Sequence, residues 1–393
     1  MQVAHESHLE SLVKGFDGQL TYDGREGHTF VAGVSLEQRE TEEYFEEFIL
    51  QYSRVDSVEY VLDTGDTVHV PVGLYELADH YYFSWLNEDL DIDSEPGEVT
   101  TWNYGAYVQD EMKFLEKKLN LTLGLRLDKY EGFDLRRSPR VGLVIHPVRG
   151  LTIKNLWGRA FKPPTARQKY AVRIDGKSPG NPNVGPEKIT TFETAIGYSF
   201  ENNALIQMNY FSNTLTDFIE SINYGPYSNS DDKRKITGLE VDLRADFRFR
   251  LHHLREVSLF SNYSLIDADD EIGSREIPVP SVAEHTANLG IKLQNIWMTL
   301  YSGWNFVGRR NRSETYHAGV RVEEYRERDN KGGYLVWDVN LKIRDFVRLP
   351  IELGLAVHNL LDKEHYNPTY DPDTYYDYAK ERRNVSVKVT MKL

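Results

Sequence analysis

The stretch "GLEVDLRADFRF", residues 238–249, decides the fold. Its apolar and charged side chains alternate without a break: Leu239, Val241, Leu243, Ala245, Phe247 and Phe249 against Glu240, Asp242, Arg244, Asp246 and Arg248. A period of two places the two sets on opposite faces of a β-strand, whereas a helix would scatter the charges around its circumference. The stretch therefore predicts a strand with one apolar face and one charged face.

The same alternation recurs along most of the chain. Residues 119–128 carry leucine at every odd position, and residues 385–393 end the chain with five apolar side chains alternating with polar ones. Similar runs occupy residues 196–200, 206–210, 257–265, 287–293, 335–343 and 351–357. Counted by this template there are about 15 strands, many of them 10 residues or longer, against roughly 5 to 6 residues in soluble sheets.

The connections between these strands alternate in length. Short ones are expected near residues 23–27, 116–118, 147–150, 201–203, 294–295 and 347–350, and long polar ones near residues 41–101, 162–187, 223–235, 267–284, 308–333 and 362–382. Long strands with tight turns at one end and large loops at the other predict an all-β, antiparallel up-and-down transmembrane β-barrel. The alternative is a soluble β-protein whose apolar face packs into a core.

Composition narrows the function classes. The chain has 393 residues, no cysteine and a formal net charge of −15. The absence of cysteine excludes disulfides and thiolate chemistry, and the acidic balance argues against a nucleic-acid partner, which requires a basic surface. The N-terminus resembles no signal peptide, and no window of 18 apolar residues predicts a membrane helix. Such windows do not detect barrels, because barrel strands alternate.

Seven segments, in order, resemble one protein family. They are "YGAYVQDEMK" (104–113), "SPRVGLVIHP" (138–147), "GRAFKPPT" (158–165), "GNPNVGPEKITTFE" (180–193), "KITGLEVDLRA" (235–245), "VPSVAEHTANLGI" (279–291) and "VHNLLDKEHYNP" (357–368). Together they resemble the barrel of TonB-dependent outer-membrane receptors. The prolines, glycines and asparagines in these segments suit strand ends and turns, so they are expected to shape a barrel rather than contact a ligand.

The resemblance implies a fold and a function. Family barrels have about 22 strands, and a plug domain inside them couples transport to TonB. Neither the plug patterns nor the coupling motif are found, so residues 1–393 are expected to be a partial barrel domain, a fragment without its plug. The implied function is uptake of a metal chelate, with a ferric siderophore as the favoured ligand, across the outer membrane of a Gram-negative bacterium. The alternatives are a plugless passive pore or structural barrel fragment, or uptake of cobalamin or haem.

The implied partners follow from that function. They are outer-membrane lipid, the metal-chelate ligand, the TonB complex through the plug, and the barrel assembly machinery, which reads the last strand. No nucleic acid, cofactor, resident metal or enzymatic activity is predicted, because no catalytic motif rises above chance. Haem is disfavoured by the absence of histidine between Phe161 and Val184, where haem receptors of this family carry one.

Candidate ligand residues are sought in the long loops. Guanidinium and phenol groups suit an anionic chelate, since arginine offers paired donors and aromatic rings offer stacking faces. Residues 308–330 and 365–383 are rich in both, and the candidates are Arg309, Arg310, Arg312, Tyr316, Tyr325, Tyr370 and Tyr375. The alternative for each is a solvated loop of mixed charge.

A structural role is predicted for the charged face of residues 238–249. A charge facing lipid costs about 2 to 4 kcal/mol at mid-depth. Glu240, Asp242, Arg244, Asp246 and Arg248 are therefore expected to line the barrel lumen.

Overall fold

The computed structural model describes most of the chain. The described residues are 2–51, 57–61, 67–71, 83–84, 98–170, 172–173, 180–201, 203–221, 226–251, 254–273, 275–311, 316–317, 320–321, 330–344, 350–368 and 377–391.

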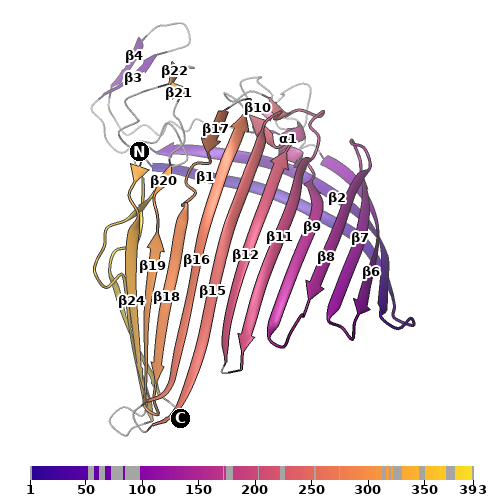
Figure 1. The fold of residues 1–393 in the computed structure, drawn as a ribbon. Coiled ribbons are helices and arrows are strands. Elements are labelled where there is room, and N and C mark those ends of the chain that lie inside the picture. The colour runs from indigo at the N-terminus through magenta and orange to yellow at the C-terminus, as the bar shows by residue number, and fades with distance from the viewer. Residues whose placement is uncertain are drawn as a thin grey trace.

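One antiparallel sheet of 16 strands forms the body of the molecule (Figure 1). Fifteen of its strands follow one another in chain order, each paired with the next: β1 (Gln2–Tyr22), β2 (His28–Gln51), β6 (Glu98–Phe114), β7 (Leu119–Tyr130), β8 (Arg136–Ile145), β9 (Leu151–Lys162), β11 (Glu187–Phe200), β12 (Ala204–Thr216), β15 (Lys233–Leu251), β16 (Leu254–Ile272), β18 (His285–Gln294), β19 (Met298–Val307), β24 (Tyr334–Ile343), β25 (Ile351–His358) and β28 (Asn384–Met391). The sixteenth, β17 (Arg275–Pro278), pairs with β16. The predicted up-and-down sheet is confirmed.

The small elements gather at one end of the sheet. Figure 1 places α1 (Ala166–Tyr170) and β17 at the end opposite the tight turns. The long connections form two-stranded sheets: β3 (Ser57–Val61) with β4 (Thr67–Pro71), β10 (Val172–Arg173) with β5 (Phe83–Ser84), β13 (Ile219–Ser221) with β14 (Tyr227–Asn229), β20 (Arg310–Asn311) with β23 (Asn330–Lys331), β21 (Tyr316–His317) with β22 (Val320–Arg321), and β26 (Tyr366–Asn367) with β27 (Tyr378–Ala379). The ends are called here the loop end and the turn end.

One predicted boundary was wrong. Residues 41–101 were expected to form a loop, but β2 continues to Gln51 and β6 begins at Glu98. The reason lies in residues 44–50, "YFEEFIL", which carry aromatic and β-branched side chains that extend a strand. The paired strand β1 begins at Gln2, opposite Gln51, so the two strands support each other over their whole length.

Hydrophobic side chains lie on the surface of the sheet rather than in a core. Among the described residues, the buried hydrophobic side chains are Val184, Ala245, Ala268 and Val336. Large apolar side chains of the strands are exposed on one face, including Leu123, Ile196, Leu243 and Leu289 at 40 to 45%. A soluble β-protein would bury this face, so the exposure favours a face that meets lipid.

Glycines on the other face let bulky side chains lie flat across the sheet. A Cβ added to Gly290 would overlap the Phe260 ring, and one added to Gly33 would overlap the Tyr107 ring. Phe260 and Gly290 are direct cross-strand partners, as are Tyr107 and Gly33. The aromatic ring occupies the space that the glycine leaves, which fixes the register of the two strands.

The two edges of the sheet do not meet. The strand order begins at β1 and ends at β28, and in the described residues each of these strands has one neighbour, β2 and β25 respectively. Every described residue of β28 is exposed. The sequence leaves open whether the last strand closes onto residues 12–22 or leaves an open edge, and in the described residues the edge is open.

In the part of the chain that the structure describes, no helix is long and apolar enough to cross a membrane.

Candidate ligand-facing surface

The strand register gathers the polar side chains on one face. Glu240 lies opposite Asn209 and Ser264, and Asp242 lies opposite Gln207 and Asn262. Arg244, Asp246 and Arg248 alternate along the same side of β15, so these three charged residues share the polar face with Glu240 and Asp242. Their role as lumen-lining residues remains a prediction, which this arrangement supports.

Amide side chains form a chain across three strands of the polar face. Asn305 Nδ2 donates to Asn288 Oδ1 at 2.5 Å, and Asn288 Nδ2 donates to Asn262 Oδ1 at 2.8 Å. Nearby charges pair along the same face, with Lys292 Nζ 2.6 Å from Glu256 Oε1. Hydrogen bonds and ion pairs of this kind satisfy polar groups on a strand without help from solvent.

The polar face is concave. A cavity of about 1070 Å³ is lined by residues of seven consecutive strands, from Asp17 and Gln19 of β1 to Thr191 and Glu193 of β11. Strands so far apart in the sheet share one cavity only if the sheet curves toward that side. Tyr107 Oη donates to Gln19 Oε1 across this hollow at 2.8 Å.

Two arginines extend into the same hollow. Arg126 Nε donates to both carboxylate oxygens of Asp128, at 2.9 and 3.0 Å, its Nη2 donates to Ser35 Oγ at 3.1 Å, and its guanidinium lies over the Tyr107 ring. Arg140 donates to the Gln109 side chain. Asp128 neutralises Arg126, whereas in the described residues no carboxylate lies within 4.0 Å of Arg140.

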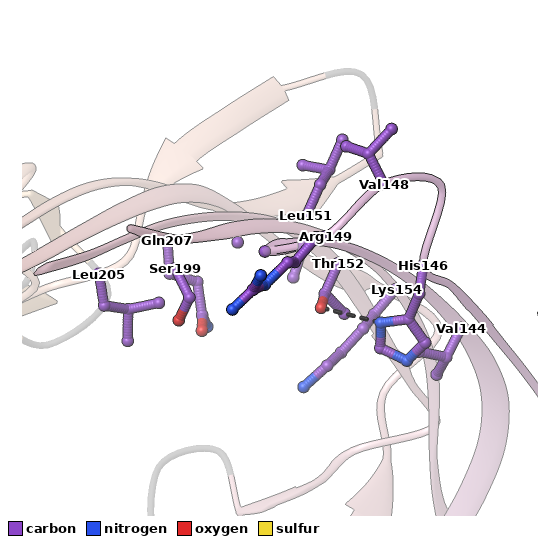
Figure 2. Close-up of a pocket in the computed structure, with 13 residues that line it drawn as sticks. Val144, His146, Val148, Arg149, Leu151, Thr152, Lys154, Ser199, Leu205 and Gln207 are labelled. Carbon is purple, nitrogen blue, oxygen red and sulfur yellow. Dashed lines mark hydrogen bonds between the residues drawn. The ribbon is translucent and has the colours of Figure 1, made fainter. Parts of the chain in front are cut away.

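A second cavity lies on the polar face at the turn end (Figure 2). It measures about 580 Å³, and β11 contributes the small residues Ala195, Gly197 and Ser199 to its floor. Its polar lining includes Lys154, Arg149, Gln207 and His146, whose Nδ1 lies 3.1 Å from Thr152 Oγ1. Arg149 also contacts Glu201 at 3.4 Å, so this basic region is partly neutralised at its rim.

The segment at residues 180–187 joins two loops at the loop end. Asn229 Nδ2 donates to the carbonyl oxygens of Gly185 and Asp217, at 2.9 and 2.7 Å, and Gly185 N donates back to Asn229 Oδ1. Asn181 Nδ2 donates to Tyr227 O at 2.9 Å, and Ile219 N donates to Glu187 Oε1 at 3.0 Å. The connection after β9 is thus fastened to the β13–β14 hairpin, which is an architectural role.

A buried lysine lies beneath this region. Lys169 of α1 is 8% exposed, and its Nζ lies 5.8 Å from the centre of the Tyr170 ring. Burial lowers the pKa of Lys169, and the nearby Glu131 partly offsets that effect. Burial of the ammonium beside the glycine turn at Gly132 shows how tightly α1 packs on the β7–β8 connection.

The segment at residues 357–368 forms a second fastening. Asn359 is fully buried, its Nδ2 donates to Lys363 O at 2.8 Å, and its Oδ1 accepts from Lys363 N at 2.8 Å. Asp362 binds both Nε and Nη2 of Arg382, at 3.0 and 2.9 Å. The Arg382 guanidinium, helped by the backbone N–H of Arg383, holds the pKa of Asp362 well below its usual range.

The predicted ligand residues are placed unevenly. Arg309 is exposed at the start of the loop after β19, whereas Arg310 is 7% exposed and contacts other loops. Tyr316 lies in β21, where only the backbone is described. Arg312, Tyr325, Tyr370 and Tyr375 lie outside the described residues. Their ligand role stays a prediction.

Acidic and histidine side chains form no metal-binding group in the described part of the chain, since no three of them lie close enough together to share an ion.

A family model described as "TonB dependent receptor-like, beta-barrel" matches residues 6–360, most of the chain. The chain belongs to the TonB-dependent receptor family. This confirms the resemblance drawn from the seven segments. The family fold is that of outer-membrane transporters, and it accounts for a sheet with one apolar face and one polar, concave face.

Solved TonB-dependent receptors share the fold. The ferric-catecholate import receptor Fiu from E. coli K12 superposes with a TM-score of 0.66 at 15% identity, covering 98% of this chain and 55% of that one. The copper transporter OprC gives a TM-score of 0.64 at 18% identity, covering 98% and 56%. The chain spans about half the length of these relatives.

A curated relative matches about half of the chain. The probable hemoglobin and hemoglobin-haptoglobin-binding protein 3 of Haemophilus influenzae is 23% identical over 217 residues, which are 49% of this chain and 18% of that protein.

Sequence reasoning missed several residues that organise this surface. Arg126, Arg140, Asn229 and Asn359 were not singled out, although the last two lie in or near polar loop segments. Asparagine in a loop after a strand is a signal for side chains that bond to the backbone. No comparable signal marks Arg126 and Arg140, because every charged residue on the polar face looks alike in one sequence.

Proposed function

We propose that this TonB-dependent receptor barrel takes up an anionic metal chelate, in the form of a ferric siderophore, across the outer membrane. The observation that carries the proposal is the family match over residues 6–360, on a sheet whose polar face is concave. Arg309, Arg312 and the loop tyrosines 316, 325, 370 and 375 would contact the ligand, and β15 would contribute lumen-lining charges. Energy would reach the receptor from the TonB complex through a plug domain.

A growth assay with the full-length gene tests this function. A bacterial host lacking its own siderophore receptors would be supplied with iron as ferric catecholate, ferric hydroxamate or ferric citrate, or with cobalamin. Growth on one of the ferric chelates that requires both this gene and an intact TonB supports the proposal. Growth that persists without TonB would instead indicate a passive pore.

A second candidate function is uptake of haem iron. The relative in Haemophilus influenzae favours it, since that protein's name describes hemoglobin binding. The absence of histidine between Phe161 and Val184 disfavours it. Hemin and hemoglobin as sole iron sources belong in the same growth panel, and TonB-dependent growth on either would replace the siderophore proposal.

A further inference from the structure

Arg310 follows Arg309 in sequence but differs from it completely in surroundings. Arg309 is exposed, whereas Arg310 is 7% exposed. The Arg310 Nη1 donates to Asn367 Oδ1 at 2.8 Å, and its Nη2 donates to the carbonyl oxygen of Tyr366 at 2.6 Å. Its guanidinium carbon lies 5.5 Å from the centre of the Tyr334 ring. The side chain is therefore held on two edges and one face by groups that lie far away in sequence.

Three consecutive connections at the loop end meet at this side chain and its backbone. Arg310 belongs to the connection after β19, residues 308–333. The Arg310 backbone forms a β-bridge with Ala283, and Ser281 N donates to Asn311 O at 2.8 Å. These two contacts connect it to the loop after β16, at residues 281–283. Its guanidinium ties in residues 359–383 through β26.

The neighbours of Arg310 reinforce the junction. Tyr334, under the guanidinium, also packs against the His365 ring, with centroids 4.6 Å apart. His365 and Lys380 are joined by a backbone hydrogen bond of 3.0 Å across residues 359–383. In the described residues no carboxylate lies within 4.0 Å of Arg310, so its partners are a neutral amide, a carbonyl group and an aromatic ring. These are the groups that a planar guanidinium, but not a lysine ammonium, can engage together.

We propose that Arg310 is a positioning residue that fastens three loop-end connections to one another at residues 281–283, 310–311 and 366–367. This inference rests on the proposed function in one respect: two of the three segments carry the predicted ligand residues. A ligand that contacts both segments binds best when their arrangement is already set. If Arg310 is lost and the competent arrangement falls to about a tenth of the population, apparent affinity falls about tenfold.

A distance measurement between the loops tests the fastening without any ligand. Residues 1–393 contain no cysteine, so within them spin labels attach only at introduced sites, and any cysteine elsewhere in the full-length receptor is first replaced by serine. Gly332→Cys and Ala379→Cys suit this purpose: a Cβ on Gly332 meets nothing within 4 Å, and Ala379 is exposed. Full-length receptor in lipid should give a narrow label-to-label distribution, Arg310→Ala should broaden it, and Arg309→Ala should not. An equally narrow distribution in Arg310→Ala would overturn the proposal.

Transport of the chelate identified by the growth assay provides the second arm. Arg310→Ala should raise the KM for uptake about tenfold with little change in the maximal rate, and Arg310→Lys should recover only part of that loss. Arg309→Ala is the comparison variant: it removes an exposed arginine that could contact the ligand directly but does not connect the loops. If Arg310→Ala raises the KM while the spin-label distances stay narrow, Arg310 contacts the ligand directly and the positioning role is wrong. If no chelate supports growth, the proposed function fails while the distance arm still decides the role of Arg310.

Discussion

Asn359 combines complete burial with a left-handed backbone. Its φ is 52°, a conformation that asparagine and glycine adopt more readily than other residues. Its backbone N–H donates to Asp338 Oδ1 at 2.9 Å, while its side chain both donates to and accepts from the backbone of Lys363. The Asn359 side chain therefore closes the turn after β25, and its backbone N–H links that turn to Asp338 of β24.

Replacing Asn359 should destabilise the receptor. Asn359→Ala removes both side-chain bonds to the Lys363 backbone and strains the left-handed backbone, a loss of about 2 to 4 kcal/mol. Asn359→Gly also lacks the side-chain bonds but avoids the backbone strain, so it should be about 1 kcal/mol more stable than Asn359→Ala. Urea unfolding in detergent micelles measures both. The control is Asn384→Ala, whose exposed amide donates to Glu381 Oε1; equal losses in all three variants would contradict the assignment.

The Asp362–Arg382 pair should make the last loop sensitive to acid. The pKa of Asp362 is depressed in the folded state. The stabilisation is therefore present above the unfolded value of about 3.9 and is lost as the pH falls through the folded pKa. Asp362→Asn should make residues 359–383 more susceptible to protease than wild type at pH 7. That difference should shrink below about pH 3, and a constant difference across this range would show that the charge is not responsible.

At the scale of the strand, the two faces of β15 should differ in how much stability an introduced charge costs. Leu243 lies on the apolar face opposite Ile206 and Ser261, and Asp242 lies on the polar face. Leu243→Arg should cost about 2 to 4 kcal/mol in a bilayer, whereas Asp242→Arg should cost little. Folding into lipid vesicles, followed by heat-modifiable gel mobility, compares the two. A larger loss for Asp242→Arg would reverse the assignment of the faces.

The stability cost of replacing a glycine by alanine should depend on the side chain that covers that glycine. The Phe260 ring occupies the space above Gly290, so Gly290→Ala forces the ring aside and should cost about 1 to 3 kcal/mol. Gly354→Ala is the matched control on the same face, because its added Cβ would meet Lys388 at an ordinary 3.7 Å. The temperature at which the heat-modifiable band shifts should fall for Gly290→Ala alone.

Strands were predictable from the sequence and contacts between loops were not. A period of two fixes faces locally, so the short turns and most strand bounds follow from patterns such as residues 238–249. The predicted end of a strand at residue 41 was wrong because apolar and polar side chains stop alternating regularly in residues 42–51, although β2 continues through them. Arg310 illustrates the limit for the site, because sequence shows a guanidinium in a polar loop but not the Tyr366 carbonyl that receives it.

At the scale of the whole molecule, the edges of the sheet are its least protected part. The described residues of β28 pair only with β25. About half of the β28 amides therefore point away from any strand, whereas β25 is paired on both sides over residues 353–357. Hydrogen exchange on the 393-residue chain in micelles should show alternate fast amides in β28 and slow ones across residues 353–357. Uniform protection of β28 would mean that this edge has acquired a partner.

The pairing of each strand with its neighbour in sequence has a consequence for the order of assembly. Nearly every junction joins strands separated by a few residues or one loop, so the sheet can grow as a series of hairpins at small cost in chain entropy. The pairing of β2 with β6 is different, because the connection between these two strands, residues 52–97, is the longest between paired strands of the sheet. Closure entropy rises with loop length, so this junction is the expected kinetic bottleneck. The strands from β6 to β28 can therefore pair with one another before the β1–β2 hairpin pairs with β6.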